Sequence, residues 1–186
     1  MDAITEANWQ NLRSQDGNLR LDALNSMLTA TDQRVDWAYE LWDELLATLR
    51  HADNHQRAIA AQLLANLAKS DPQNRMLNDF DALFAVTKDE RFVTARHSLQ
   101  AIWKVGAAGK QHQLLVVERL TSRFRDCATE KNSTLIRYDI IQGLRKLYDD
   151  VQDETIRETA LALIATEADT KYRKKYASLW RPGKPA

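Results

Sequence analysis

The sequence predicts an all-α fold in a single domain. Its 186 residues include only five glycines and three prolines, whereas sheet proteins need many turns and doubly wound folds need glycine at phosphate-binding turns. Apolar residues recur every three or four positions along almost the whole chain, as the buried stripe of a helix requires. An apolar share of 44% and a charged share of 28% exclude a disordered or fibrous chain. The length is sufficient for a sizeable core.

Capping residues mark the helix starts in the N-terminal half. Asp16, Asp32 and Asp53 each stand where a new apolar stripe begins, and aspartate is favoured at the N-cap. Asp71 and Pro72 combine an N-cap with proline at the first helical position. We therefore expect helices over 4–14, 17–30, 33–50, 54–69 and 72–87.

The C-terminal half continues this pattern. Leu114, Val117 and Leu120 follow one another at a spacing of three residues, and Asp89 and Asp153 stand at expected helix starts. Helices are expected over 90–107, 110–128, 132–150, 153–168 and 170–180, about ten in all. Connections of two to five residues make consecutive helices antiparallel neighbours.

Arginine recurs at related positions in the chain. Arg20, Arg57, Arg137 and Arg157 each follow a potential capping residue by four positions and precede a small or apolar residue by three. Ala95 stands at the equivalent position of the third unit, so the first four units are spaced by 37, 38 and 42 residues. A period of this length with two helices per unit resembles HEAT repeats.

The resemblance to HEAT repeats is carried best by the segment 92–106, which looks like the family's second helix. It implies a right-handed α-α superhelix of about five hairpins, forming one repeat domain over 1–186. Because Arg157 comes only 20 residues after its predecessor, 153–186 is expected to be an irregular C-terminal cap and basic tail. The family further implies that acid and arginine side chains join neighbouring repeats. Plain helix capping with a pair four residues apart, and an irregular helical bundle, are the alternatives.

Residues that carry chemistry are few. The sequence contains neither a glycine-rich phosphate-binding loop nor a Gly-x-Ser-x-Gly elbow. The single cysteine, Cys127, excludes an internal disulfide and a cysteine-built zinc site, and is expected to be a packing residue. His51 and His55 have chelating spacing, but Asp53 is expected to begin a new helix between them. We therefore predict a non-enzyme with no catalytic residue, no metal and no cofactor.

The N-terminus predicts no secretory signal, because it has neither a basic segment nor an apolar one. No apolar run approaches the ~18 residues of a membrane span. Together with the single cysteine, these features predict a cytoplasmic protein with no membrane partner.

Polar and aromatic residues share one face of the expected second helices. Aligning the repeats places Gln62, Gln100 and Gln142 at one equivalent position. Gln100 and Gln142 are each the middle member of three side chains spaced i, i+4 and i+7, which share an exposed face. In a HEAT-like solenoid this face would be the concave side. Arg, Trp and Tyr are enriched in binding hot spots. A protein or peptide partner is therefore expected to contact Arg96, Gln100, Trp103, Tyr138, Gln142 and Arg145. The alternative is that Trp103 and Tyr138 pack between repeats.

The zero net charge is a cancellation. Residues 1–93 carry nine basic and fifteen acidic residues, 94–170 carry eleven of each, and 171–186 carry six basic residues and no acidic one. The basic tail comprises Lys171, Arg173, Lys174, Lys175 and Arg181, with Tyr172, Tyr176 and Trp180 interleaved. Aromatic residues among basic ones suit nucleic acid, but helical spacing favours docking on the last repeat. Terminal capping ranks first, self-association with the acidic half of a second copy ranks second, and nucleic-acid binding ranks third.

The alternative function is nucleic-acid binding, in the manner of a DNA glycosylase. Some HEAT-like proteins are DNA glycosylases for alkylated purines, which use a concave cleft with tryptophans and a catalytic aspartate. Trp103 and the acidic clusters resemble that chemistry without a residue-by-residue match, and the acidic N-terminal half opposes DNA. A weaker resemblance, to HEAT-like bilin lyases, implies a linear tetrapyrrole as ligand.

Overall fold

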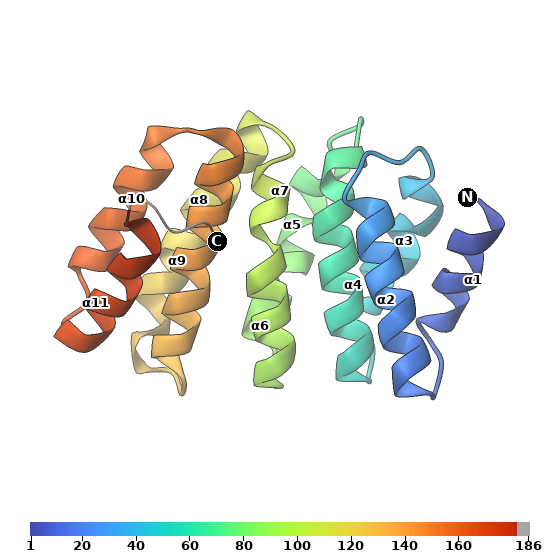
Figure 1. Ribbon diagram of the computed structural model, residues 1–186, viewed down its shortest axis with the longest axis horizontal. Helices are drawn as coiled ribbons and strands as arrows, with labels where there is room; N and C mark the ends of the chain where they lie inside the picture. Colours follow the sequence, from blue (N-terminus) through green and yellow to red (C-terminus); the bar gives the residue numbers. More distant parts are fainter. Residues whose placement is uncertain (182–186) are drawn as a thin grey trace.

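The computed structural model describes residues 1–181, and every regular element in this part of the chain is a helix. The helices form five antiparallel hairpins stacked in a row (Figure 1). The first helices of the hairpins are α1 (Ala3–Asn11), α3 (Ala38–Thr48), α5 (Arg75–Ala85), α8 (Lys110–Asp126) and α10 (Glu154–Ala165). The second helices are α2 (Gly17–Thr31), α4 (Asn54–Leu67), α6 (Phe92–Ala101) with the short α7 (Trp103–Gly106), α9 (Ser133–Val151) and α11 (Thr170–Ala177).

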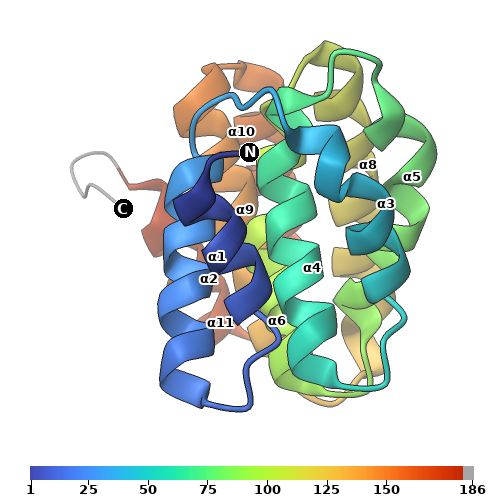
Figure 2. The same cartoon turned by 90° about the vertical axis from the view of Figure 1, so that its right-hand side faces the viewer.

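The second helices lie side by side and form one layer of the molecule, here called the second-helix layer. In this layer α4 packs between α2 and α6, and α9 packs between α6 and α11. Figure 1 shows α2, α4, α6 and α9 in front of the fainter α3, α5 and α8, and Figure 2 shows the two layers from the N-terminal end. The expected all-α solenoid is therefore confirmed by the stacking of the hairpins.

Helix boundaries differ from the expected ones in a regular way. Four expected helices end in a 3-10 turn, as helix C-termini often do, at Ala68–Ser70, Val86–Lys88, Cys127–Thr129 and Ser178–Trp180. The expected helix 90–107 is divided at Ile102, where the Val105 N–H bonds to the Ile102 carbonyl three residues back rather than four. That tighter bonding separates α6 from α7.

Two expected helix starts were wrong. Asp32 ends α2 instead of beginning the next helix, and the chain runs irregularly to α3 while the Val35 N–H donates to Ser70 Oγ at 3.0 Å. Pro72 lies in a turn before α5, which begins only after Asn74, a residue with a left-handed φ of 55°. Asp71 still serves the helix, because its carboxylate accepts the Met76 N–H at 2.7 Å.

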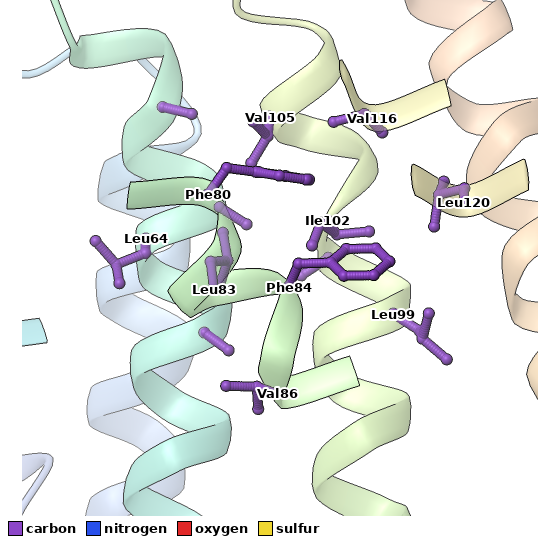
Figure 3. Close-up of a cluster of buried hydrophobic side chains, with 14 of the residues drawn as sticks. Leu64, Phe80, Leu83, Phe84, Val86, Leu99, Ile102, Val105, Val116 and Leu120 are labelled. Atoms are coloured by element: carbon purple, nitrogen blue, oxygen red, sulfur yellow. The ribbon is translucent and has the colours of Figure 1, made fainter. Parts of the chain in front are cut away.

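A continuous apolar core fills the space between the two layers (Figure 3). Phe80 and Leu83 of α5 are buried against second-helix residues such as Leu64 and Ile102, and Val116 of α8 completes the cluster. Burying a side chain of this size contributes roughly 1.5–3 kcal/mol. Each hairpin alone would leave apolar surface exposed on both flanks, so stacking is what completes the core.

Buried ion pairs join neighbouring hairpins. The Arg57 guanidinium donates to both carboxylate oxygens of Asp89, at 2.6 and 2.9 Å, and so links α4 to the segment before α6. Arg137 of α9 donates to the buried Glu167, which follows α10, at 2.8 Å. Arg20 and Arg157 contact only their own hairpins in the hydrogen bonds and ion pairs of residues 1–181, the latter through Glu154 three residues earlier. Arginine therefore joins repeats at two of the four expected positions.

The last hairpin, α10 and α11, packs on α8 and α9 at one end of the row. Of the expected C-terminal cap and basic tail, residues 182–186 lie outside the described part of the chain. Among residues 1–181, no helix combines the length and the apolar character that crossing a bilayer requires.

Candidate functional site

The exposed face of the second-helix layer carries a groove of about 570 Å3 between α2, α4 and α6. Its apolar wall is formed by Leu21, Leu24 and Leu28 of α2, Ala58 and Ile59 of α4, and Val93 of α6. Leu21 and Val93 have 55% and 64% of their surface exposed. Large aliphatic side chains with this exposure on one concave surface are typical of a site that binds an apolar partner.

The groove exists because α2 has more apolar surface than its own packing uses. Ala23 and Met27 turn into the core, with 1% exposure each. Leu21, Leu24 and Leu28, spaced i, i+3 and i+7, form a second stripe on the adjoining side of the helix. Leu24 and Leu28 of this stripe pack partly against the core, whereas Leu21 is 55% exposed, so Leu21 is apolar surface that the packing of the helix leaves unused.

The polar side chains around the groove are neutral or basic, and its lining contains neither aspartate nor glutamate. Asn54 and Thr94 join the walls at the α4–α6 seam, where Thr94 Oγ1 donates to the Asn54 carbonyl at 3.2 Å. Partial desolvation, and then the charge of Arg96, lower the pKa of His97, so its imidazole is neutral at pH 7. The groove therefore presents hydrogen-bonding groups beside its apolar wall.

Arg96 and Gln100, two of the expected contact residues, converge on one buried carboxylate. The Arg96 guanidinium donates to both oxygens of Asp139, at 2.7 and 2.9 Å, and the Gln100 amide donates to the same carboxylate at 3.1 Å. The Asp139 side chain has no exposed surface, whereas that of Arg96 is 34% exposed. The hydrogen bonds to Asp139 raise the pKa of Arg96. This cluster ties α6 to α9 and leaves the Asp139 carboxylate occupied.

Trp103 and Gln142 lie at the α7–α9 seam. Trp103 is half-buried and packs against the core, with the Lys104 ammonium 6.0 Å from its ring centre. At Gly143 of α9 a Cβ would lie 3.8 Å from the Trp103 Cβ, an ordinary van der Waals distance, so this seam has room for a small side chain. Gln142, beside this glycine, is half-buried as well.

Tyr138 and Arg145 contact the C-terminal segment. The Tyr138 ring lies 6.5 Å from that of Tyr176, and the Arg145 guanidinium lies 5.5 Å from the ring centre of Trp180. Arg145 also donates to the Leu179 carbonyl at 3.4 Å. The six expected residues thus divide into two groups: Arg96, Gln100, Trp103 and Gln142 lie at the seam between α6–α7 and α9, and Tyr138 and Arg145 contact the C-terminal segment. Four of the six, Arg96, Gln100, Tyr138 and Arg145, stabilise the fold through Asp139 or the C-terminal segment.

The basic and the aromatic residues of the tail take opposite sides. Tyr176 is fully buried, its hydroxyl donates to the Thr134 carbonyl at 2.9 Å, and burial raises its pKa. Trp180 is buried against Tyr148, with ring centres 5.5 Å apart. The charged residues are all exposed, namely Lys171, Arg173, Lys174, Lys175 and Arg181. This arrangement agrees with terminal capping, which ranked first.

The structure separates the other candidate chemical groups. Asp53 caps α4 between His51 and His55, accepting the His55 N–H at 2.8 Å. Burial raises the pKa of the Cys127 thiol, which keeps it protonated and unreactive. Residues 1–181 contain no group of three or more His, Cys, Asp or Glu side chains placed to hold a metal ion.

Sequence reasoning missed the groove. The signal was present in Leu21, Leu24 and Leu28, which repeat at helical spacing beside the buried Ala23 and Met27. The sequence does not predict that Ile59 and Val93, from two other hairpins, line the same groove.

No protein-family model matches the sequence, and neither does any curated protein. One solved structure with a similar chain path is a designed armadillo repeat protein, YIII(Dq)4CqI, with 18% sequence identity and a TM-score of 0.47. The match covers 93% of this chain and 87% of the designed protein. That the chain is a helical repeat solenoid follows from its own stacked hairpins (Figures 1 and 2).

Proposed function

We propose that this protein is a non-enzymatic, HEAT-like scaffold that binds a segment of a protein partner on the exposed face of its second-helix layer. The observation that carries the proposal is the groove between α2, α4 and α6, with Leu21 and Val93 more than half exposed in its wall. Single exposed apolar side chains are ordinary on a protein surface, but a contiguous concave set marks a binding site.

The proposed mechanism is rigid display. Ala58 and Ile59 of the groove wall belong to α4, which lies in the middle of the layer between α2 and α6 and is fixed by neighbours on both sides. A partner therefore binds a preformed surface, and little conformational entropy of the scaffold is lost on association. Arg96, Gln100, Trp103, Tyr138, Gln142 and Arg145 would form the continuation of this contact surface toward α9.

The proposal is tested by introducing charge into the groove. The double variant Leu21→Glu and Val93→Glu places two carboxylates in the apolar wall at positions that the fold leaves exposed. The matched control is Leu114→Glu with Leu161→Glu, because these leucines are 59% and 42% exposed on α8 and α10, outside the groove. Circular dichroism should show the same helix content for both variants.

The readout is capture of partners from native lysate, with mass spectrometry of what is retained. We expect the groove variant to lose proteins that the control and the unchanged chain retain. Retention of the same proteins by all three chains would refute the assignment of the groove.

Gln142→Glu tests the extension toward α9. The Gln142 side chain makes no hydrogen bond within residues 1–181, so its replacement should leave the fold intact. Arg145 is a less suitable choice, because it bonds to Asp149 and to the C-terminal segment. Loss of capture supports a contact surface that reaches α9. Unchanged capture limits it to the groove.

The proposal includes a cytoplasmic location. The single cysteine, Cys127, is a buried free thiol, as is usual for proteins of reducing compartments. Fluorescence microscopy of a tagged chain in its own cells tests the location directly.

A further inference from the structure

The outward side of α11 carries an uncompensated cluster of positive charge. Lys171, Lys174 and Lys175, spaced i, i+3 and i+4, share this side of an eight-residue helix, and Arg173 and Arg181 lie beside them. All five side chains are exposed, and none of them takes part in the ion pairs of residues 1–181. Most arginines of the second-helix layer, by contrast, are paired with a carboxylate.

The charges of the cluster repel one another, because like charges three or four residues apart are destabilising on a helix surface. The helix dipole disfavours Lys171 in the first turn and favours Lys174 and Lys175 in the last turn, so it does not offset the repulsion of Lys171. Packing of α11 does not need these charges, because Tyr176 and Trp180 supply its buried contacts. Two of the lysines make exposed cation–π contacts, Lys175 4.8 Å from the Tyr138 ring centre and Lys171 5.6 Å from that of Tyr172, and such contacts stabilise only weakly at exposed sites.

We infer that the exposed side of α11 is a second interaction surface, which binds an acidic peptide segment of a protein partner. Carboxylates of such a segment would neutralise the cluster and relieve its internal repulsion. This surface lies at the C-terminal end of the solenoid, apart from the groove of α2, α4 and α6, so the inference does not depend on the proposed function of the groove.

Nucleic acid fits the same surface less well. The aromatic rings that could stack on bases are turned inward, since Tyr176 has no exposed surface and Trp180 only 8%. An eight-residue helix is about 12 Å long, whereas a duplex carries one charge per ~1.7 Å over its whole length. Most of the duplex charge would therefore find no cation, and residues 1–93, with six more acids than bases, would repel it.

The experiment measures binding of a fluorescent deca-glutamate peptide to the full chain by anisotropy, at several salt concentrations. The test variant is Lys171→Gln, Lys174→Gln and Lys175→Gln. The matched control is Arg34→Gln, Arg50→Gln and Lys88→Gln, which removes three exposed cations elsewhere and changes the net charge equally. A duplex DNA probe of similar total charge runs in parallel, and sedimentation of the unlabelled chain reports self-association.

We expect the peptide to bind the unchanged chain and the control, with an affinity that falls as salt rises. The test variant should bind about tenfold more weakly and should melt at the same temperature as the unchanged chain or higher. Equal loss in test and control variants overturns the inference, as does an absence of peptide binding at low salt. A lower melting temperature of the test variant would show that the lysines serve packing instead. Tighter binding of the duplex, or self-association that the test variant abolishes, would assign the surface to nucleic acid or to a second copy.

Discussion

The pair of Arg96 and Asp139 makes a sharp prediction about stability. Asp139 is fully buried, and three hydrogen bonds from Arg96 and Gln100 satisfy its carboxylate. In Arg96→Ala the carboxylate keeps only the bond from Gln100. Breaking a buried pair in this way costs about 3–5 kcal/mol, because a buried charge is left uncompensated.

The expected loss lies at the lower end of that range. Arg96 is 34% exposed, so water can enter the space that the guanidinium vacates and solvate part of the charge. We therefore expect a loss of about 3 kcal/mol in the free energy of unfolding. For a chain of this length, that corresponds to a fall in melting temperature of roughly 6–12 °C.

Urea unfolding followed by circular dichroism measures the effect, and Arg157→Ala is the matched control. Arg157 also lies on a helix and also pairs with an acid, but its side chain is 50% exposed and that of Glu154 is 59% exposed. An exposed pair contributes at most about 1 kcal/mol. Equal unfolding free energies for Arg96→Ala and Arg157→Ala would refute the reasoning. In Arg96→Met with Asp139→Leu no charge remains buried, so most of the stability should return.

Three further predictions follow from packing and titration. Gly106→Ala should destabilise the chain by about 1–3 kcal/mol, because the new Cβ would lie 2.8 Å from a methyl carbon of the buried Leu147. The nearest neighbours of a Cβ at Gly143 are 3.8 Å away. Gly143→Ala should therefore raise the melting temperature, since alanine is favoured over glycine in a helix by about 1 kcal/mol. His112 is 3% exposed, and burial lowers its pKa from 6.5. The unfolded chain therefore binds the proton more readily, and the free energy of unfolding should fall as the pH drops below 6.5. His112→Gln should flatten this pH dependence in urea titrations from about pH 7 to about pH 5. Trp180→Ala should release α11 from α9 and speed amide exchange in the last hairpin, whereas exchange in α4 should stay unchanged.

The helices could be predicted from the sequence, but their ends could not. A spacing of three and four residues reports a buried face whatever the neighbours are, and it located every hairpin. Val35 belongs to such a stripe and was placed in a helix, yet its N–H bonds to Ser70 of the next hairpin and the chain there is irregular. A hydrogen bond between hairpins overrides the local pattern, and no local pattern reports it.

The contact residues predicted from the sequence lie on the same layer as the groove, but they are different residues from those that line it. Alignment of Gln100 with Gln142 identified the seam of α6 and α9, since equivalent positions on stacked helices lie side by side. It could not show that Arg145 is held by Leu179, because that contact joins residues 34 apart in the chain. Asp139 was informative in hindsight: an acid inside the apolar stripe of Ile136 and Ile140 must find a cation.

The arginine links between hairpins have a consequence for how the molecule comes apart. In a linear array, the ratio of nearest-neighbour coupling to the intrinsic stability of each unit decides whether the units melt one by one or all together. Arg57, Arg96 and Arg137 each add coupling across a different boundary between hairpins, in series from the second hairpin to the last. The first boundary has no buried arginine–carboxylate pair among residues 1–181. Its ion pairs, Arg13 with Glu44 and the Met1 amino group with Glu40, involve carboxylates that are more than half exposed, and such pairs contribute little. We therefore expect unfolding to begin at the first hairpin, α1 and α2, and to proceed toward the C-terminal end of the array.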